Sequence, residues 1–195
     1  MKRLLALLAA VAVCVGLTVA PASAERVTGR DGRADVTRTD DDGTSTVAWA
    51  NFDVVRYAVR YGEHRISAVV RFRSLVPGRD VFAMVYLRPP GRRDDLPPTV
   101  AVTAGRGHRA GTSVLIGVER RCRPRHRVDY RRDLVRMSFP ARCLGRPRYV
   151  DASVLSIGFR SLSRPTYVDI APGTARDYQR SGSGVDFPTV RVRRG

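Results

Sequence analysis

The sequence has 195 residues, with 35 Lys and Arg against 18 Asp and Glu, and its formal net charge is +17. This length suits one domain with a substantial apolar core. Lys2 is the only lysine, so residues 3–195 exclude Schiff-base chemistry on a side chain and a phosphate-binding loop of the kind that needs a lysine.

The first residues have the pattern of a secretory signal peptide. Lys2 and Arg3 precede an uncharged stretch over residues 4–20, and Ala22-Ser23-Ala24 places small residues where a signal peptidase cleaves. We therefore predict a signal peptide over residues 1–24 and an exported protein, either extracellular or associated with the cell envelope. No later apolar run is long enough to span a membrane.

Two other interpretations of the first residues stay open. The apolar run is about 17 residues long, at the lower limit for a membrane-spanning helix, although Pro21 and the small residues after it favour cleavage. The sequence Val11-Ala12-Val13-Cys14 resembles a lipoprotein attachment site, but Val13 stands where a small residue is expected.

The excess of arginine has two explanations. A field of this size attracts anionic partners such as nucleic acid, cell-wall polymers or acidic lipids, and arginine makes two-pronged contacts with phosphate and carboxylate. A GC-rich genome would also produce arginine in place of lysine without any functional reason. The sequence therefore leaves open whether the positive charge binds an anionic polymer or envelope component.

Two cysteines remain after removal of the signal peptide. Cys122 and Cys143 form an even pair in an exported chain, which predicts a disulfide. A metal site or a nucleophilic thiol would need partners nearby, and His126 is the one candidate. One histidine and two cysteines lack a fourth ligand at a recognisable spacing.

Apolar residues alternate with polar ones through most of the chain, which indicates β-strands. Val55 to Tyr61 and Ile66 to Phe72 predict a hairpin around Gly62-Glu63-His64, with Arg56, Arg60 and Arg71 opposite the apolar positions. We expect an all-β fold: a single antiparallel, jelly-roll-like sandwich of eight or nine strands over residues 47–195. Residues 25–46 are interpreted as a polar, acidic segment before it.

The densest charge lies between residues 120 and 148, which contain eleven arginines but only two aspartates. Like charges enclosed by a disulfide need either solvent or an anion, so we interpret this stretch as a polyanion-binding loop. A solvated basic loop is the alternative. The candidate binding residues are Arg120, Arg121, Arg123, Arg125, Arg127, Arg131 and Arg132.

A second cluster of charge is acidic. Asp31, Asp35 and the run Asp40-Asp41-Asp42 precede the first clear strand, and carboxylates of this kind can hold Ca²⁺. The spacing does not fit an EF-hand, because aligning Gly43 with its glycine would place Arg38 at the first ligand position. A solvated linker is the alternative, and we predict no metal or cofactor beyond this weak calcium candidate.

No catalytic motif is present, so a non-enzymatic module is expected. His64, His108 and His126 lie in or beside predicted turns without a motif around them. Trp49 is either a core residue or a sugar-stacking platform, which makes a glycan-binding module using Trp49 and tyrosines an alternative function. A secreted hydrolase with an assembled site is a further alternative.

Three segments resemble small secreted actinobacterial proteins, mostly uncharacterised. They are residues 52–57, residues 65–75 and the stretch from Phe139 to Pro147, and the similarity extends over most of residues 31–160. The sandwich of these proteins is similar to DOMON-like and carbohydrate-binding-module-like domains. The shared motifs, a hairpin and a Cys-Leu-Gly turn, are structural, so the resemblance implies a β-sandwich and no catalytic residues.

Overall fold

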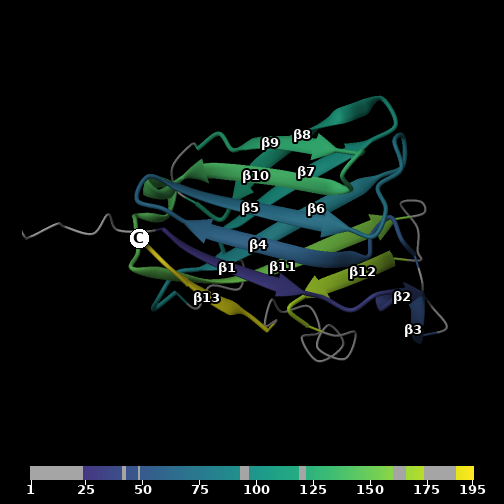
Figure 1. The fold of residues 1–195 in the computed structure, drawn as a ribbon, viewed down its shortest axis with the longest axis horizontal. Coiled ribbons are helices and arrows are strands. Elements are labelled where there is room, and N and C mark those ends of the chain that lie inside the picture. Colours follow the sequence, from purple (N-terminus) through teal and green to yellow (C-terminus); the bar gives the residue numbers. More distant parts are fainter. Residues whose placement is uncertain are drawn as a thin grey trace, which may run out of the picture.

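The protein is described by a computed structural model that defines residues 24–40, 43–47, 49–92, 97–118, 122–159, 166–173 and 188–195. The predicted signal peptide lies outside these ranges, except for Ala24. Two antiparallel β-sheets pack face to face (Figure 1). The prediction of an all-β sandwich is confirmed.

The sheet at the front of Figure 1 has five strands in the order β1-β4-β5-β10-β9. These strands are β1 (Glu25–Arg30), β4 (Val54–Tyr61), β5 (Arg65–Phe72), β9 (Arg125–Asp129) and β10 (Leu134–Pro140). The predicted hairpin is present as β4 and β5, with a bulge where the register shifts between Val54 and Arg56. Strand β10 pairs with β5 through register partners such as Arg136 and Val69.

The second sheet has the order β3-β2-β12-β11-β6-β7-β8, and β13 pairs with one end of β11. Its strands are β2 (Val36–Asp40), β3 (Gly43–Val47), β6 (Val81–Arg88), β7 (Thr99–Gly105), β8 (His108–Ile116), β11 (Tyr149–Phe159), β12 (Thr166–Ala171) and β13 (Val190–Arg193). Strand β6 lies between β11 and β7, and most of its residues are buried.

The main core fills the space between the sheets. From β4 it receives Val54, Tyr57, Val59 and Tyr61, and from the other sheet β6 contributes residues such as Val85. Because side chains alternate across a strand, burying these positions turns the residues between them outward. Arg56 and Arg60 are therefore exposed on the outer face of the five-stranded sheet.

The described residues contain thirteen strands, more than the eight or nine expected. The polar segment over residues 25–46 contributes β1 to one sheet and β2 to the other, and β3 follows within residues 43–47. The sequence did not predict these strands because they are short and mostly polar. In β1 the inward positions include Glu25 and Gly29, so no run of alternating apolar residues marks it.

The predicted disulfide between Cys122 and Cys143 is confirmed, with the two Cα atoms 6.2 Å apart. It joins the residues before β9 to a short 3₁₀ helix, η1 (Ala141–Leu144), that follows β10. The bond therefore closes around the β9–β10 hairpin. The stretch interpreted as a basic loop consists mainly of these strands, which belong to the five-stranded sheet.

Candidate polyanion-binding surface

The predicted binding arginines separate into three groups. Arg120 and Arg121 lie outside the described residues. Arg123 is exposed before β9, and Arg131 and Arg132 are exposed in the turn between β9 and β10. Arg125 and Arg127 are exposed on β9 itself, while Val128 packs against the core. The structure thus places the last two on the outer face of the five-stranded sheet.

Strand pairing brings arginines from distant regions of the chain onto that same face. Arg30, Arg56 and Arg71 are successive register partners across β1, β4 and β5. Arg26 is paired with Arg60, and Arg127 is paired with Arg136. We call this surface the arginine face and define it by Arg26, Arg30, Arg56, Arg60, Arg71, Arg125, Arg127 and Arg136.

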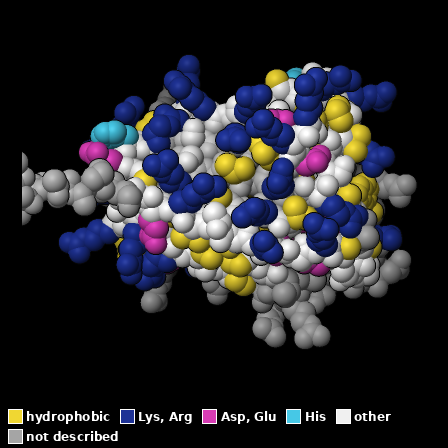
Figure 2. Space-filling model, in the orientation of Figure 1, with side chains coloured by type: hydrophobic (Ala, Val, Ile, Leu, Met, Phe, Trp, Pro, Cys, Tyr) yellow, Lys and Arg dark blue, Asp and Glu magenta, His cyan; other side chains and the backbone are white. Residues whose placement is uncertain are grey.

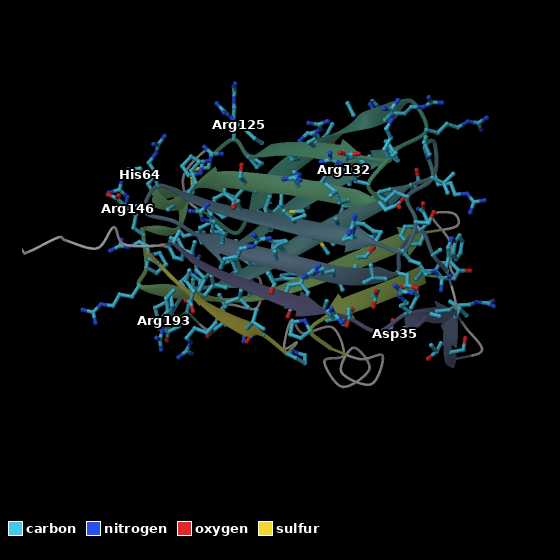
Figure 3. The ribbon with its side chains drawn as sticks, viewed as in Figure 1. Asp35, His64, Arg125, Arg132, Arg146 and Arg193 are labelled. Atoms are coloured by element: carbon cyan, nitrogen blue, oxygen red, sulfur yellow. A yellow bond between two sulfur atoms is a disulfide. The ribbon has the colours of Figure 1, made fainter. Side chains whose placement is uncertain are left out.

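Basic side chains spread over this face in Figure 2, with small apolar areas between them. The eight arginines of the face are all exposed. The neighbouring Arg132 lies at one end of the β9–β10 hairpin, and Arg125 lies toward the other end (Figure 3). Because adjacent strands are about 4.8 Å apart, the five strands present cations across about 19 Å.

Among the residues that the structure describes, no ion pair neutralises the arginine face. Opposed like charges destabilise a sheet, yet the nearby carboxylates are used elsewhere. Asp129 accepts a hydrogen bond from the backbone N–H of Arg132 at 3.2 Å. Asp133 accepts one from the backbone N–H of Leu75 at 2.8 Å. The positive charge therefore faces solvent.

A shallow hollow of about 330 Å³ lies in the arginine face. Its apolar lining includes Ala58, Val69 and Leu134, and the arginine side chains rise around it. Two contacts between neighbouring elements cross the same face. Arg71 Nε donates to the carbonyl of Arg132 at 3.4 Å, and Arg65 donates to Ser138 Oγ at 2.8 Å.

Sequence alternation already placed Arg56, Arg60 and Arg71 opposite the core. It did not show that β10 lies beside β5, because that pairing joins residues more than 60 positions apart. The arginines of β1 were missed entirely, since that strand was not predicted. The useful signal in β1 is the recurrence of Arg26, Thr28 and Arg30 at every second position.

The calcium candidate Asp40-Asp41-Asp42 is only partly within the described residues. Asp40 ends β2, and Asp41 and Asp42 lie outside them. The acidic residues that the fold brings together are instead Asp31, Asp35 and Asp169. Burial is the largest cause that raises the pKa of Asp31 to about 8 and that of Asp169 to about 7, and neighbouring carboxylates add to both shifts.

One histidine has two hydrogen-bonded neighbours. His126 Nδ1 lies 2.8 Å from Ser113 Oγ, and His126 Nε2 lies 3.0 Å from the carbonyl oxygen of Ala110. Because a carbonyl only accepts, Nε2 carries the proton and, in the neutral ring, Nδ1 accepts from the serine. The described residues place no carboxylate on this ring, so the pair lacks the third member of a hydrolase triad. It joins β8 to β9 at the side of the sandwich.

The other histidines are exposed. His64 lies in the turn between β4 and β5, with Nε2 3.6 Å from a carboxylate oxygen of Glu63, and His108 begins β8. Glu119 lies outside the described residues. These positions provide no assembled catalytic group.

Trp49 is half-buried beside two aromatic rings. Its ring centroid is 3.9 Å from that of Tyr167 and 5.5 Å from that of Phe52, in edge-to-face arrangements. A hollow of about 450 Å³ lies against it, lined also by Arg79, Asp80 and Arg106. Trp49 is therefore packed against a small apolar cluster and borders a polar hollow.

No protein-family model matches this chain, and no curated protein matches it either. The resemblance to small secreted actinobacterial proteins therefore stays a prediction. Among the described residues there is no helix of the length and apolar character needed to cross a membrane.

Proposed function

We propose that this protein is an exported, non-enzymatic β-sandwich module that binds an anionic polymer or another anionic component of the cell envelope through the arginine face. The observation that carries the proposal is the row Arg30, Arg56 and Arg71, in which three like charges are direct neighbours across three strands. Such a row opposes folding through repulsion. An anion that bridges the guanidinium groups removes that cost.

The chemistry of arginine favours phosphate-bearing polymers. A guanidinium group donates two parallel hydrogen bonds to one phosphate, and it keeps its charge at any physiological pH. Rows of arginine at intervals along extended strands suit a ligand with repeated charges better than one small anion. The arginine face therefore supports multivalent, weakly selective binding in which released counterions supply much of the affinity.

The test uses inorganic polyphosphate as the probe and compares two double variants with equal loss of charge. In R56Q/R136Q the charges leave the arginine face. In R79Q/R106Q they leave exposed positions on other loops. Two surface contacts of about 0.7 kcal/mol each predict a tenfold weaker Kd for R56Q/R136Q at 0.1 M salt. We expect less than a twofold change for R79Q/R106Q.

The salt dependence gives a second measure of the same surface. The slope of log K against log salt should become shallower by about 1.4 in R56Q/R136Q, from about 0.7 for each lost phosphate contact on a flexible chain. Equal effects of the two double variants would show that only net charge matters. The arginines would then reflect composition rather than a site.

The hollow beside Trp49 favours glycan binding as a second candidate. A half-buried indole ring next to polar side chains is a surface on which a sugar ring can stack. Here Trp49→Ala should abolish retention on a glycan array while leaving the polyphosphate Kd unchanged. Unchanged glycan retention in this variant would remove the candidate.

A further inference from the structure

Four aspartates meet where the chain passes from β1 in one sheet to β2 in the other. Asp31 and Asp35 begin and end this short connection, Asp53 directly precedes β4, and Asp169 lies within β12. Asp31, Asp35 and Asp169 each offer one oxygen, and these three oxygens lie within 4.8 Å of one another. Figure 3 marks Asp35 at this crossing, beside β2.

Backbone groups hold two of the carboxylates in place. Asp169, which is 4% exposed, accepts hydrogen bonds from the N–H groups of Val54 at 2.6 Å and Ile170 at 2.9 Å. Asp53 is completely buried, and its Oδ2 accepts from the N–H of Ala34 at 2.7 Å. These bonds connect the crossing to both sheets.

Several oxygens in the group remain without a donor. The second oxygen of Asp53, Oδ1, is buried and has no hydrogen-bond partner, and the same holds for Asp31 Oδ2 and Asp35 Oδ1. Asp53 is held near the other three, because its Oδ2 accepts from Ala34 in the same connection and the next residue, Val54, donates to Asp169. Its charge contributes to the raised pKa of Asp31, Asp35 and Asp169. A buried acceptor without a partner is costly, and a cation that these oxygens bind would remove that cost.

Arg73 forms an ion pair with one member of the group. Arg73 Nη1 lies 3.3 Å from Asp53 Oδ2, and this guanidinium is one-third exposed. Burial is the largest cause that raises the pKa of Asp31 to about 8, and the charges of Asp169, Asp35 and Asp53 add to it. This arginine is paired with Asp53, and the pKa values of Asp31 and Asp169 are raised beside it.

We propose that Asp31, Asp35 and Asp169, supported by Asp53, bind a hard divalent cation, and that the site prefers Ca²⁺ to Mg²⁺. Calcium takes six to eight oxygen ligands at 2.3–2.6 Å, so two oxygens on one ion are at most about 5 Å apart, which fits the spacing of the three aspartates. Magnesium requires a smaller octahedron and keeps most of its water. A site with this many carboxylates from three separate segments suits the larger ion.

The bound ion would join the two sheets at one end of the sandwich. Its ligands come from the β1–β2 crossing and from β12, and Asp169 is also bonded to the start of β4. Cation binding would therefore stabilise the folded state. This inference does not depend on polymer binding.

The experiment measures Tm and binding heat for the full domain after treatment with a chelator, first with CaCl₂ and then with MgCl₂. A Ca²⁺ concentration one hundred times the Kd should raise the Tm by roughly 5–10 °C. We expect a smaller rise with MgCl₂. The apparent Ca²⁺ affinity should also be weaker at pH 6 than at pH 8.5, because protons compete for carboxylates whose pKa values are about 7 and 8.

Two variants separate the site from general effects of charge. Asp31→Asn keeps the shape of the side chain and removes one ligand charge, so it should fold and lose the Tm response to Ca²⁺. Asp129→Asn removes one charge from β9, far along the chain from the site, and should keep the full response. A wild-type protein with no Ca²⁺ response at pH 8.5, or an Asp31→Asn variant with the wild-type response, would overturn the proposal.

Discussion

The arginine face and the aspartate cluster each gather like charges, but they do so in opposite surroundings. The arginines are on the outer face of a sheet, where water screens their repulsion. The aspartates lie where the chain crosses between the sheets, and Asp53 and Asp169 are buried there while Asp31 and Asp35 are partly buried. Burial and mutual repulsion raise the pKa of Asp31 to about 8 and that of Asp169 to about 7. Exposed like charges thus suit a large external ligand, whereas buried ones require a proton or an ion.

The largest expected effect comes from removing a buried carboxylate. Asp169→Ala leaves the N–H groups of Val54 and Ile170 buried without their acceptor. Two such groups at 1–3 kcal/mol each predict a loss of about 4 kcal/mol in the free energy of unfolding. The matched change on the arginine face, Arg136→Ala, should cost less than about 0.5 kcal/mol. Urea denaturation of both variants checks the difference, and similar losses would contradict it.

The second-largest effect on stability is expected from removing the disulfide that closes around the β9–β10 hairpin. Replacing both Cys122 and Cys143 by serine removes a disulfide with a sequence separation of 21 residues. Closing such a loop restricts the unfolded chain, so we expect a loss of about 3 kcal/mol in stability. Calorimetry should show a lower Tm, while the rise in Tm on adding Ca²⁺ persists because the aspartate cluster is elsewhere. Loss of the Ca²⁺ response in this variant would show that the two regions are coupled.

The cation-free protein should become less stable as the pH rises from about 5 to 8. The folded-state pKa values of Asp31 and Asp169 are raised above the ordinary value of 3.8, so across this window the folded state holds protons that the unfolded state has released. The contribution of these two groups to the free energy of unfolding is fully present below about pH 4. It is lost as the pH rises through their folded-state pKa values of about 7 and about 8. Thermal melts in chelator across this range test the sign, and saturating Ca²⁺ should reduce the slope. A Tm that rises over the window in chelator would contradict the raised pKa values.

The smallest effect is expected in the middle of the arginine row. Arg56→Gln relieves repulsion with Arg30 and Arg71, which should stabilise the protein by about 0.5 kcal/mol at low salt. The gain should vanish near 1 M salt, where the screening length falls to about 3 Å. Denaturation at both salt concentrations measures it. A loss of stability at low salt would indicate that Arg56 is held by favourable contacts and is not available for an anion.

Much of the strand pattern follows from local sequence. The alternation in Val55 to Tyr61 and in Ile66 to Phe72 predicts both the hairpin and its outward arginines, since burying one side of a strand exposes the other. The disulfide between Cys122 and Cys143 follows from an even pair of cysteines in a chain with a predicted export signal. The polar strands β1, β2 and β3 have no comparable pattern, because few of their side chains meet the core.

Neither charged region was visible as a whole in the sequence. The sequence indicated the arginine content and the dense run between residues 120 and 148, but the placement of Arg56 and Arg71 on the same face as Arg136 depends on the pairing of β5 with β10. Likewise, the acidic cluster indicated by the sequence contained Asp31, Asp35 and the run Asp40 to Asp42, whereas Asp169 reaches Asp31 and Asp35 across more than 130 residues. In the clearly alternating strands, the sequence alone set which side chains point inward or outward, because that choice is local and repeats every two residues. Which charged side chains become neighbours was decided by the tertiary structure. Strand pairing joins segments at any separation in the chain, so it produces no periodic pattern in the sequence.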